Sequence, residues 1–138
     1  MTDVEAILTL ERYFLWTGWM KKVYIDLLYA KGFSPEPLRA QKFLYKSHWL
    51  ASLHVVVDGW RSLQTRNNPY VKDAEIDATL ASPNVALLND FRNAVYHFHP
   101  EYFSEKFKGF FSPDNLVWAH RLHLAFERFF DAFGRARP

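Results

Sequence analysis

The segment YKSHWLASLHVVVDGWRSL, residues 45–63, carries the longest apolar repeat of the chain and decides its fold. Its large apolar side chains recur mostly every three or four residues, which is the period of one face of an α-helix. The repeat consists of Leu38, Tyr45, Trp49, Leu53, Val56, Trp60 and Leu63. We therefore expect a central helix from Pro35, after a turn capped by Ser34, to about Thr65. Gly59 inside this helix indicates either close packing against another helix, a kink, or the approach of a ligand to the backbone.

The pattern before this helix predicts another long helix. It starts at Thr2 or Asp3, because Thr2 and Glu5 have the spacing of a capping box. It runs towards Ala30, with Gly32 as its terminator. Apolar residues line two of its sides, so we expect both sides to be covered. One side carries Leu8, Leu15, Trp19 and Val23, and the other carries Leu10, Phe14, Ile25 and Leu28.

The second half of the chain predicts shorter helical segments and one more long helix. We expect a short polar helix over 73–81 and a helix from Pro83, capped by Ser82, to Phe98 or His99. Pro100 sets that end because it disfavours helical geometry in the residue before it. A short helix or ordered loop follows over 101–111, and a last helix with an aromatic stripe begins after Ser112 and ends at Gly134. The sum is an all-α fold in a single domain, residues 1–138: an antiparallel bundle of four long helices plus one or two short ones.

The composition limits the classes of function. The 138 residues are 49% hydrophobic and 18% aromatic, which indicates a thickly packed core or a sizeable buried interface. A formal net charge of +2 permits RNA binding without demanding it. The absence of cysteine excludes disulfides, thiolate chemistry and cysteine-bound zinc. Because no apolar run approaches the ~20 residues of a membrane span and no signal pattern opens the chain, we expect a cytoplasmic protein without a membrane partner.

Polar residues gather on one side of the helix expected around residues 89–99. At 100° per residue, the apolar side chains fall in one arc: Leu87, Leu88, Phe91, Ala94, Val95 and Phe98. Asn89, Asn93 and Tyr96 fall opposite, and Arg92 and His97 flank them about 140° apart. One copy of this helix cannot easily bring both flanking groups to one small atom, whereas two copies across a two-fold axis could.

The hexapeptide Arg92-Asn93-Ala94-Val95-Tyr96-His97 resembles the R-x4-6-H motif of the HEPN superfamily, and residues 55–61 (VVVDGWR) resemble a segment of small bacterial HEPN-like proteins. The resemblance implies an all-helical bundle that dimerises through the motif helices. For active members it implies RNA cleavage without a metal. In one variant of the family a tyrosine stands two residues after the histidine. Here that position is His99, which either supplements His97 or fills a turn.

This chemistry needs an acid–base group and a cation. A histidine titrates near neutrality and an arginine grips phosphate oxygens, so we expect His97 as acid and base and Arg92 as the phosphate clamp. Asn93 would orient His97 or donate to phosphate. The substrate-binding residues expected beside them are Tyr96, His99 and Asn89. No cofactor and no metal are expected.

The leading hypothesis is therefore a homodimeric, metal-independent endoribonuclease, acting in phage defence or as a toxin, with RNA and an antitoxin or regulatory protein as partners. The alternative is a catalytically inactive HEPN-like module that binds nucleotide, RNA or protein. A third hypothesis is a structural bundle whose aromatic residues serve assembly alone. In a plain structural role, Arg92 would pair with Asp90 or a partner's acid, and His97 would be a cation at a helix C-terminus.

Other polar residues give weaker patterns. His120 and His123 lie three residues apart on a helix, but a metal site needs three or four ligands and no motif supplies the rest. His48 and His54 do not share a face. Several charges within largely apolar helices are expected at solvated edges or in ion pairs: Asp58, Arg61, Glu127 and Arg128. Of these, Arg61 could also line an RNA groove.

Overall fold

The computed structural model describes residues 1–30, 36–98, 100, 105–110 and 112–136, with side chains for all of these except 36–39 and 108. The described residues form six helices and no strand. The helices are α1 (Asp3–Leu28), α2 (Glu36–Thr65), α3 (Ala74–Leu80), α4 (Asn84–Tyr96), α5 (Glu105–Lys108) and α6 (Pro113–Arg135). The all-α prediction is confirmed. Within this described part of the chain, no helix combines the length and apolar character needed to cross a membrane.

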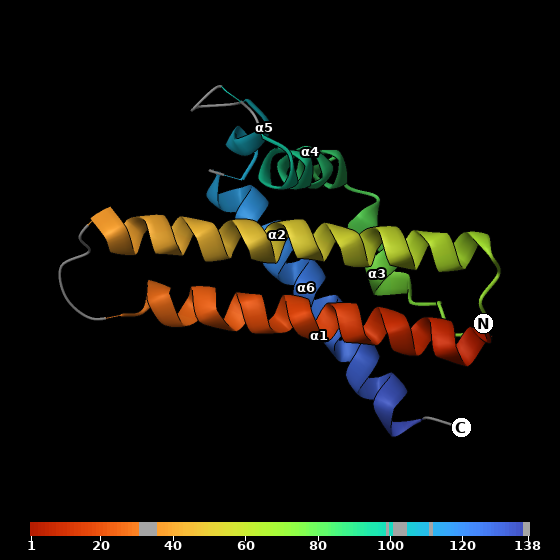
Figure 1. Cartoon of the computed structure of the whole chain (residues 1–138). Helices are drawn as coiled ribbons and strands as arrows, with labels where there is room; N and C mark the ends of the chain where they lie inside the picture. The colour runs from red at the N-terminus through yellow and green to blue at the C-terminus, as the bar shows by residue number, and fades with distance from the viewer. Residues whose placement is uncertain (31–35, 99, 101–104, 111, 137–138) are drawn as a thin grey trace.

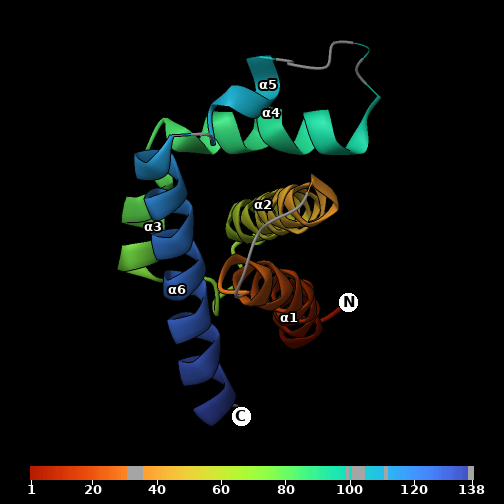
Figure 2. The same cartoon turned by 90° about the vertical axis from the view of Figure 1, so that its left-hand side faces the viewer.

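Antiparallel packing, which the sequence predicts for all the long helices, is found in α1 and α2. Figure 1 shows these two helices side by side. Figure 2, which looks along them, shows α6 crossing the pair on one side and α4 lying across α2 on another. The expectation of one antiparallel bundle is therefore wrong for α4 and α6. Because only residues 81–83 join α3 to α4, the start of α4 must lie near the end of α3, which packs beside α6.

The apolar stripe of α2 lies at the centre of the core. Four of its residues are completely buried: Trp49, Leu53, Val56 and Trp60. Aromatic rings fill the crossing with α6, where Phe14 of α1 stacks on Phe130 with ring centroids 5.3 Å apart. Trp60 meets Phe129 edge-on at 5.0 Å. Pairs of this kind add about 0.5–1.5 kcal/mol beyond their buried area. A thickly packed core therefore accounts for much of the aromatic content.

One side of α1 is not covered by the described residues. Leu10 and Phe14 are buried, as expected for one side of the helix. The other side, which we also expected to be covered, leaves Leu15 49% exposed, Trp19 64% and Val23 39%. That expectation is wrong for a single chain because α2 and α6 pack against the same half of α1 (Figure 2). We call this surface the α1 outer face, and it consists of Tyr13, Leu15, Trp16, Trp19, Met20 and Val23.

The ends of α1 and the glycine within α2 have local explanations. The predicted capping box is present: the Glu5 amide donates to the Thr2 hydroxyl at 3.1 Å, and the Thr2 amide donates to the Glu5 carboxylate at 2.7 Å. The helix ends at Leu28, short of Ala30, and the expected stop and cap at 32–35 lie outside the described residues. A Cβ on Gly59 would lie 2.5 Å from a Leu10 methyl, so close packing of α1 and α2 explains this glycine.

The turn after α2 connects it to the start of α1. Asn67 takes a left-handed conformation (φ 58°), and the Asn68 amide donates back to the Leu63 carbonyl at 3.0 Å. This pattern terminates the helix with its last carbonyls satisfied. The buried Asn68 side chain donates to the Asp3 carbonyl at 3.0 Å, and its oxygen accepts from the Tyr70 amide at 3.0 Å. The turn is thereby fixed against the first turn of α1.

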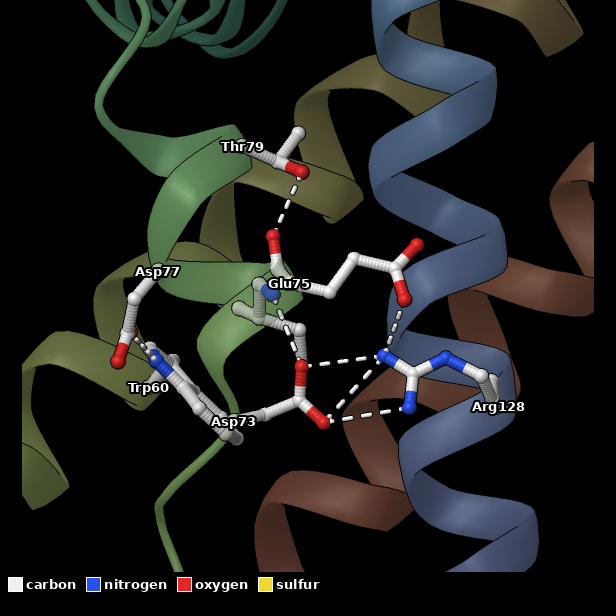
Figure 3. A network of polar contacts seen from close by, with 7 residues as sticks. Trp60, Asp73, Glu75, Asp77, Thr79 and Arg128 are labelled. Carbon is white, nitrogen blue, oxygen red and sulfur yellow. Dashed lines mark hydrogen bonds and ion pairs between the residues drawn. The ribbon is translucent and has the colours of Figure 1, made fainter.

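A network of polar contacts joins α3 to α2 and α6 (Figure 3). Asp73 caps α3 by accepting from the Ile76 amide at 2.9 Å, which accounts for the predicted start of this helix. Arg128 of α6 reaches both Asp73, at 3.1 Å, and Glu75, at 2.6 Å. The ion-pair prediction for Arg128 is therefore confirmed. Trp60 adds a link from α2 by donating to Asp77 at 3.1 Å.

Candidate functional site

Helix α4 separates its apolar and polar residues as the sequence predicts. The buried residues are Val85, Leu88, Phe91 and Ala94. Asn89 and Asn93 are partly exposed, and Tyr96 is half exposed. The helix ends at Tyr96 rather than at Phe98 or His99. As a result Phe98 does not join the apolar arc and is 91% exposed.

Arg92 is held against α2. Its Nη1 donates to Asp58 Oδ2 at 2.7 Å, and the two side chains are 29% and 52% exposed. Within the chain, the acid that pairs with Arg92 is thus Asp58 and not Asp90. The ion-pair prediction for Asp58 is confirmed. An arginine in a partly exposed pair keeps its charge available to an incoming phosphate, which can compete with the carboxylate.

His97 lies just beyond the helix, at its C-cap. Its backbone is extended (φ −125°, ψ 137°), and its amide donates to the Asn93 carbonyl at 3.0 Å. This corrects the expectation that His97 lies inside the last helical turn. The His97 side chain is exposed. The other histidine expected here, His99, lies outside the described residues.

Tyr96 turns towards the first half of α2. Its ring centroid lies 6.0 Å from that of His48. Burial raises the pKa of the Tyr96 phenol, and the charge of Arg92 acts in the opposite direction. Tyr96 is therefore a neutral hydrogen-bonding group at physiological pH.

A hollow of about 530 Å³ lies between α2, the α3–α4 connection and the start of α4. Its polar lining comes from His54, Asp58 and Arg61 of α2, Ser82 of the connection and Asn89 of α4. Its other lining residues are Leu80, Ala81, Pro83, Val85 and Ala86. We call it the α2–α4 hollow. Of the predicted substrate-binding residues it contains Asn89, and the Asp58–Arg92 pair lies at its edge.

His54 is the buried titratable group of this hollow. It is 4% exposed, its Nδ1 has no hydrogen-bond partner, and that nitrogen lies 3.5 Å from Asp58 Oδ2. Burial lowers the pKa of His54, Asp58 opposes this, and Arg92 and Arg61 lower the pKa further. The net shift is downward, so the imidazole is neutral at pH 7.

The sequence motifs do not single out His54 as a functional candidate, because it shares no helix face with His48. The signal that could have found it is the spacing of His54, Asp58 and Arg61, which lie four and three residues apart and therefore share one helix face. The same spacing explains why Arg61 reaches the hollow, where its Nη2 donates to the Leu80 carbonyl at 3.2 Å.

The other histidine pair is part of the core. His123 is 2% exposed, and its Nδ1 accepts from the Trp49 indole at 3.1 Å. A neutral imidazole that accepts at Nδ1 carries its proton on Nε2, so neither nitrogen offers a lone pair to a metal. His120 also lies against Trp49, with ring centroids 4.7 Å apart. Within the described residues no cluster of three or more metal-binding side chains occurs.

Comparisons with known proteins identify no relative of this chain. No protein-family model, no curated protein and no solved structure matches this chain significantly. The candidate site is therefore defined by its own residues: Arg92, Asn93 and His97 along and just beyond α4, with the α2–α4 hollow beside Arg92.

Proposed function

We propose that this protein is a metal-independent endoribonuclease of the HEPN type, with a composite site that two copies share. The observation that carries the proposal is the placement of Arg92. It is a charged group bound to Asp58 at the edge of a polar hollow, and it lies on the helix that ends at the exposed His97. A cation and a titratable imidazole are the two groups that RNA cleavage without a metal requires.

The reaction is an attack of the RNA 2′-hydroxyl on the adjacent phosphorus. His97 removes the hydroxyl proton or protonates the leaving 5′-oxygen, while Arg92 stabilises the charge that develops on the phosphate. Asn93 donates an amide hydrogen bond to the phosphate or to His97. The P–O5′ bond breaks as the P–O2′ bond forms, so the products carry a 2′,3′-cyclic phosphate and a 5′-hydroxyl.

Two copies account for the geometry better than one. Arg92 of a single chain is directed towards Asp58 on α2, whereas the extended backbone at His97 carries its side chain beyond the end of α4. In a two-fold dimer that pairs the polar faces of α4, the histidine of one copy reaches the arginine of the other.

Cleavage of a labelled RNA in EDTA tests the proposal. We expect His97→Ala and Arg92→Ala to abolish cleavage, and the matched control Arg66→Ala, an exposed arginine in the turn after α2, to leave it unchanged. Equal cleavage by the wild type and His97→Ala would remove His97 from the mechanism. So would a wild type that cleaves no RNA at high protein concentration.

Mixing the two inactive variants tests the shared site. Each mixed dimer of Arg92→Ala and His97→Ala chains contains one intact pair of Arg92 and His97, provided that the two groups come from different copies. Random exchange of subunits makes half of the dimers mixed, so about a quarter of the wild-type activity should return. No recovery after confirmed exchange places both groups in one copy.

A second candidate function, assembly of copies through aromatic residues, is supported by the α1 outer face. Its three aromatic side chains, Tyr13, Trp16 and Trp19, are 41%, 43% and 64% exposed, which corresponds to roughly 300 Å² per copy from these alone if an aromatic side chain buries 150–250 Å². Monomers rarely expose a continuous apolar patch larger than a few hundred Å². A stable interface buries about 800 Å² per partner.

The occupant that fits this face is a second copy of α1 in antiparallel orientation. With the two-fold axis at Trp19, Arg12 and Asp26 lie seven residues to either side. At 100° per residue they lie about 20° on either side of the Trp19 line, so Arg12 of each copy meets Asp26 of the other near the middle of the face. Both side chains are exposed.

Sedimentation of Trp19→Lys and of the control Leu124→Lys, on an exposed part of α6, tests this candidate. If copies assemble through this face rather than through α4, the first variant should be monomeric and the second should remain dimeric. Arg12→Glu should weaken the dimer, and adding Asp26→Arg should restore it. A wild type that is monomeric at tens of micromolar, or a Trp19→Lys variant that still dimerises, overturns it.

A further inference from the structure

We propose that protonation of His54 releases α4 from α2, so that acid detaches the helix that carries Arg92 while the crossing of α1, α2 and α6 stays folded. This goes beyond the proposed cleavage, because His54 takes no part in that reaction. The release depends on how α4 packs and not on whether the protein cleaves RNA.

His54 lies where α4 covers α2. Its side chain lines the α2–α4 hollow together with Val85, Ala86 and Asn89 of α4, and it is 4% exposed. While α4 stays in place, water therefore cannot hydrate this imidazole when it gains a proton. A buried charge without hydration is unfavourable unless a partner of opposite charge compensates it.

The carboxylate beside His54 is already paired. Asp58 Oδ2 lies 2.7 Å from Arg92 Nη1 and 3.5 Å from His54 Nδ1, so the arginine and the imidazole face the same oxygen. Arg61 on α2 also acts on the imidazole, and the remaining lining residues of the hollow carry no charge. A proton on His54 would thus place three cations around one carboxylate.

The sign of the pH dependence follows from this arrangement. Burial, as the main cause, lowers the pKa of His54 while α4 is docked; Asp58 opposes the shift, and Arg92 and Arg61 add to it. A solvated histidine titrates near 6.5. Between the two values only the state with α4 released binds the proton, so this state gains population as the pH falls below about 6.5.

Helix α4 forms a layer of its own over α2, on the side away from α1 (Figure 2). Phe91 packs edge-on against Phe107 at 5.3 Å, so α5 stays with α4. The crossing of α1 and α6 is filled by other rings, such as the stacked pair of Phe14 and Phe130. Release of α4 therefore leaves this crossing intact.

Hydrogen exchange of the backbone amides tests the release, with peptides compared at pH 7 and pH 5 after correction for the intrinsic pH dependence of exchange. In the wild type, protection of residues 84–96 should fall by up to about 25-fold, the most that one histidine with a pKa of 6.5 in the released state can give. Helix α1 should remain more protected than α4 at both pH values. Equal protection of α1 and α4 at pH 5 would mean global unfolding and overturns the proposal.

The matched variants are His54→Gln and His123→Gln, since glutamine does not titrate. His54→Gln should keep at pH 5 the α4 protection that it has at pH 7. His123→Gln, which changes the crossing of α2 and α6 instead, should lose α4 protection as the wild type does. An equal loss of α4 protection in the wild type and His54→Gln overturns the proposal.

Arg61→Gln tests the release with the imidazole in place. It removes one of the cations that act on His54, and glutamine can still donate to the Leu80 carbonyl that Arg61 binds. The loss of α4 protection in acid should then be smaller than in the wild type, whereas the control Arg66→Gln, in the turn after α2, should match the wild type. Equal losses in Arg61→Gln and the wild type overturn the proposal, also where His54→Gln does not fold.

These measurements use no RNA, so they are separate from the cleavage test. A wild type that cleaves no RNA but releases α4 in acid would lose the proposed function and keep the release. A wild type that cleaves RNA and holds α4 equally at pH 7 and pH 5 would keep the function and lose the release.

Discussion

The Trp49 indole donates to Nδ1 of His123 across 3.1 Å, and the two side chains are 0% and 2% exposed. This hydrogen bond joins the centre of α2 to the middle of α6, where the helices cross. It also occupies the Nδ1 lone pair of one of the two histidines for which the sequence supplied no further metal ligands. The bond therefore contributes to the stability of the crossing, while burial is the main cause that keeps His123 neutral.

The two single replacements of this pair should together lower the free energy of unfolding by more than the double replacement does. Trp49→Phe and His123→Leu each leave one buried polar atom unpaired, which costs about 1–3 kcal/mol in addition to any cavity. The double variant loses both groups, so its loss of unfolding free energy should be smaller than the sum of the single losses by about 1 kcal/mol or more. Urea unfolding measures this, and strictly additive losses would contradict it.

Acid should destabilise the protein through His123. Burial, with the charge of Lys21 on α1 and then His120 on α6, lowers the pKa of His123 to about 3 in the folded protein. The unfolded chain titrates near 6.5. Between these values only the unfolded state binds the proton, so stability falls as the pH drops from about 6.5 towards 3, by at most about 1.4 kcal/mol per pH unit.

The control for this pH dependence is His123→Gln. Glutamine can accept the Trp49 hydrogen bond through its side-chain oxygen but does not titrate. The free energy of unfolding of this variant, measured between pH 7 and pH 4, should fall less steeply than that of the wild type. Equal slopes would assign the acid sensitivity to other groups, such as His54.

Two helical glycines should respond in opposite directions to replacement by alanine. Gly18 in α1 has open space around an added Cβ, so Gly18→Ala should stabilise the protein by about 1 kcal/mol through helix propensity. Gly59→Ala places a Cβ 2.5 Å from a methyl of the buried Leu10, and the repacking costs about 1–3 kcal/mol. We therefore expect a net loss at Gly59. Equal gains in thermal stability would show that the Leu10 side chain moves aside without cost.

The N-cap bond of Asp73 in α3 should contribute more to the free energy of unfolding than the ion pair of Asp73 with Arg128. Asp73→Ala removes both the bond to the Ile76 amide and the bonds to Arg128, and should cost about 1–2 kcal/mol. Asp73→Asn keeps a capping oxygen and loses the ion pair, which at this partly exposed site contributes about 0.2–1 kcal/mol. Urea midpoints of the two variants compare these contributions. A loss in Asp73→Asn as large as in Asp73→Ala would assign the stability to Arg128 instead.

The protonation of Asp73 gives a second check of the same site. Burial would raise the pKa of Asp73, but hydrogen bonds from Arg128 and the Ile76 amide outweigh it and the pKa is lowered. The ionised Asp73 therefore contributes to the free energy of unfolding above its usual pKa near 3.9. This contribution is lost as the pH falls through the lower pKa that Asp73 has in the folded protein. Asp73 thus changes the stability at pH values below most of the range, about 6.5 to 3, over which His123 changes it, so the two contributions can be measured separately.

The sequence by itself determined the helices and most of their ends. The capping box of Thr2 and Glu5, the cap at Asp73 and the stripe from Trp49 to Trp60 depend on residues within a few positions of each other. Such local patterns are readable because the helix period and the capping bonds are fixed by backbone geometry.

The tertiary structure decided how the helices cross and which side chains meet. Asp58 pairs with Arg92 across 34 residues, and α4 and α6 lie across the α1–α2 pair instead of alongside it. The exposure of Trp19 and the unpartnered nitrogen of His54 follow from the same crossing. No local pattern contains this information, because a helix with apolar residues on several sides can pack in more than one direction and the choice depends on the shapes of side chains far apart in the sequence.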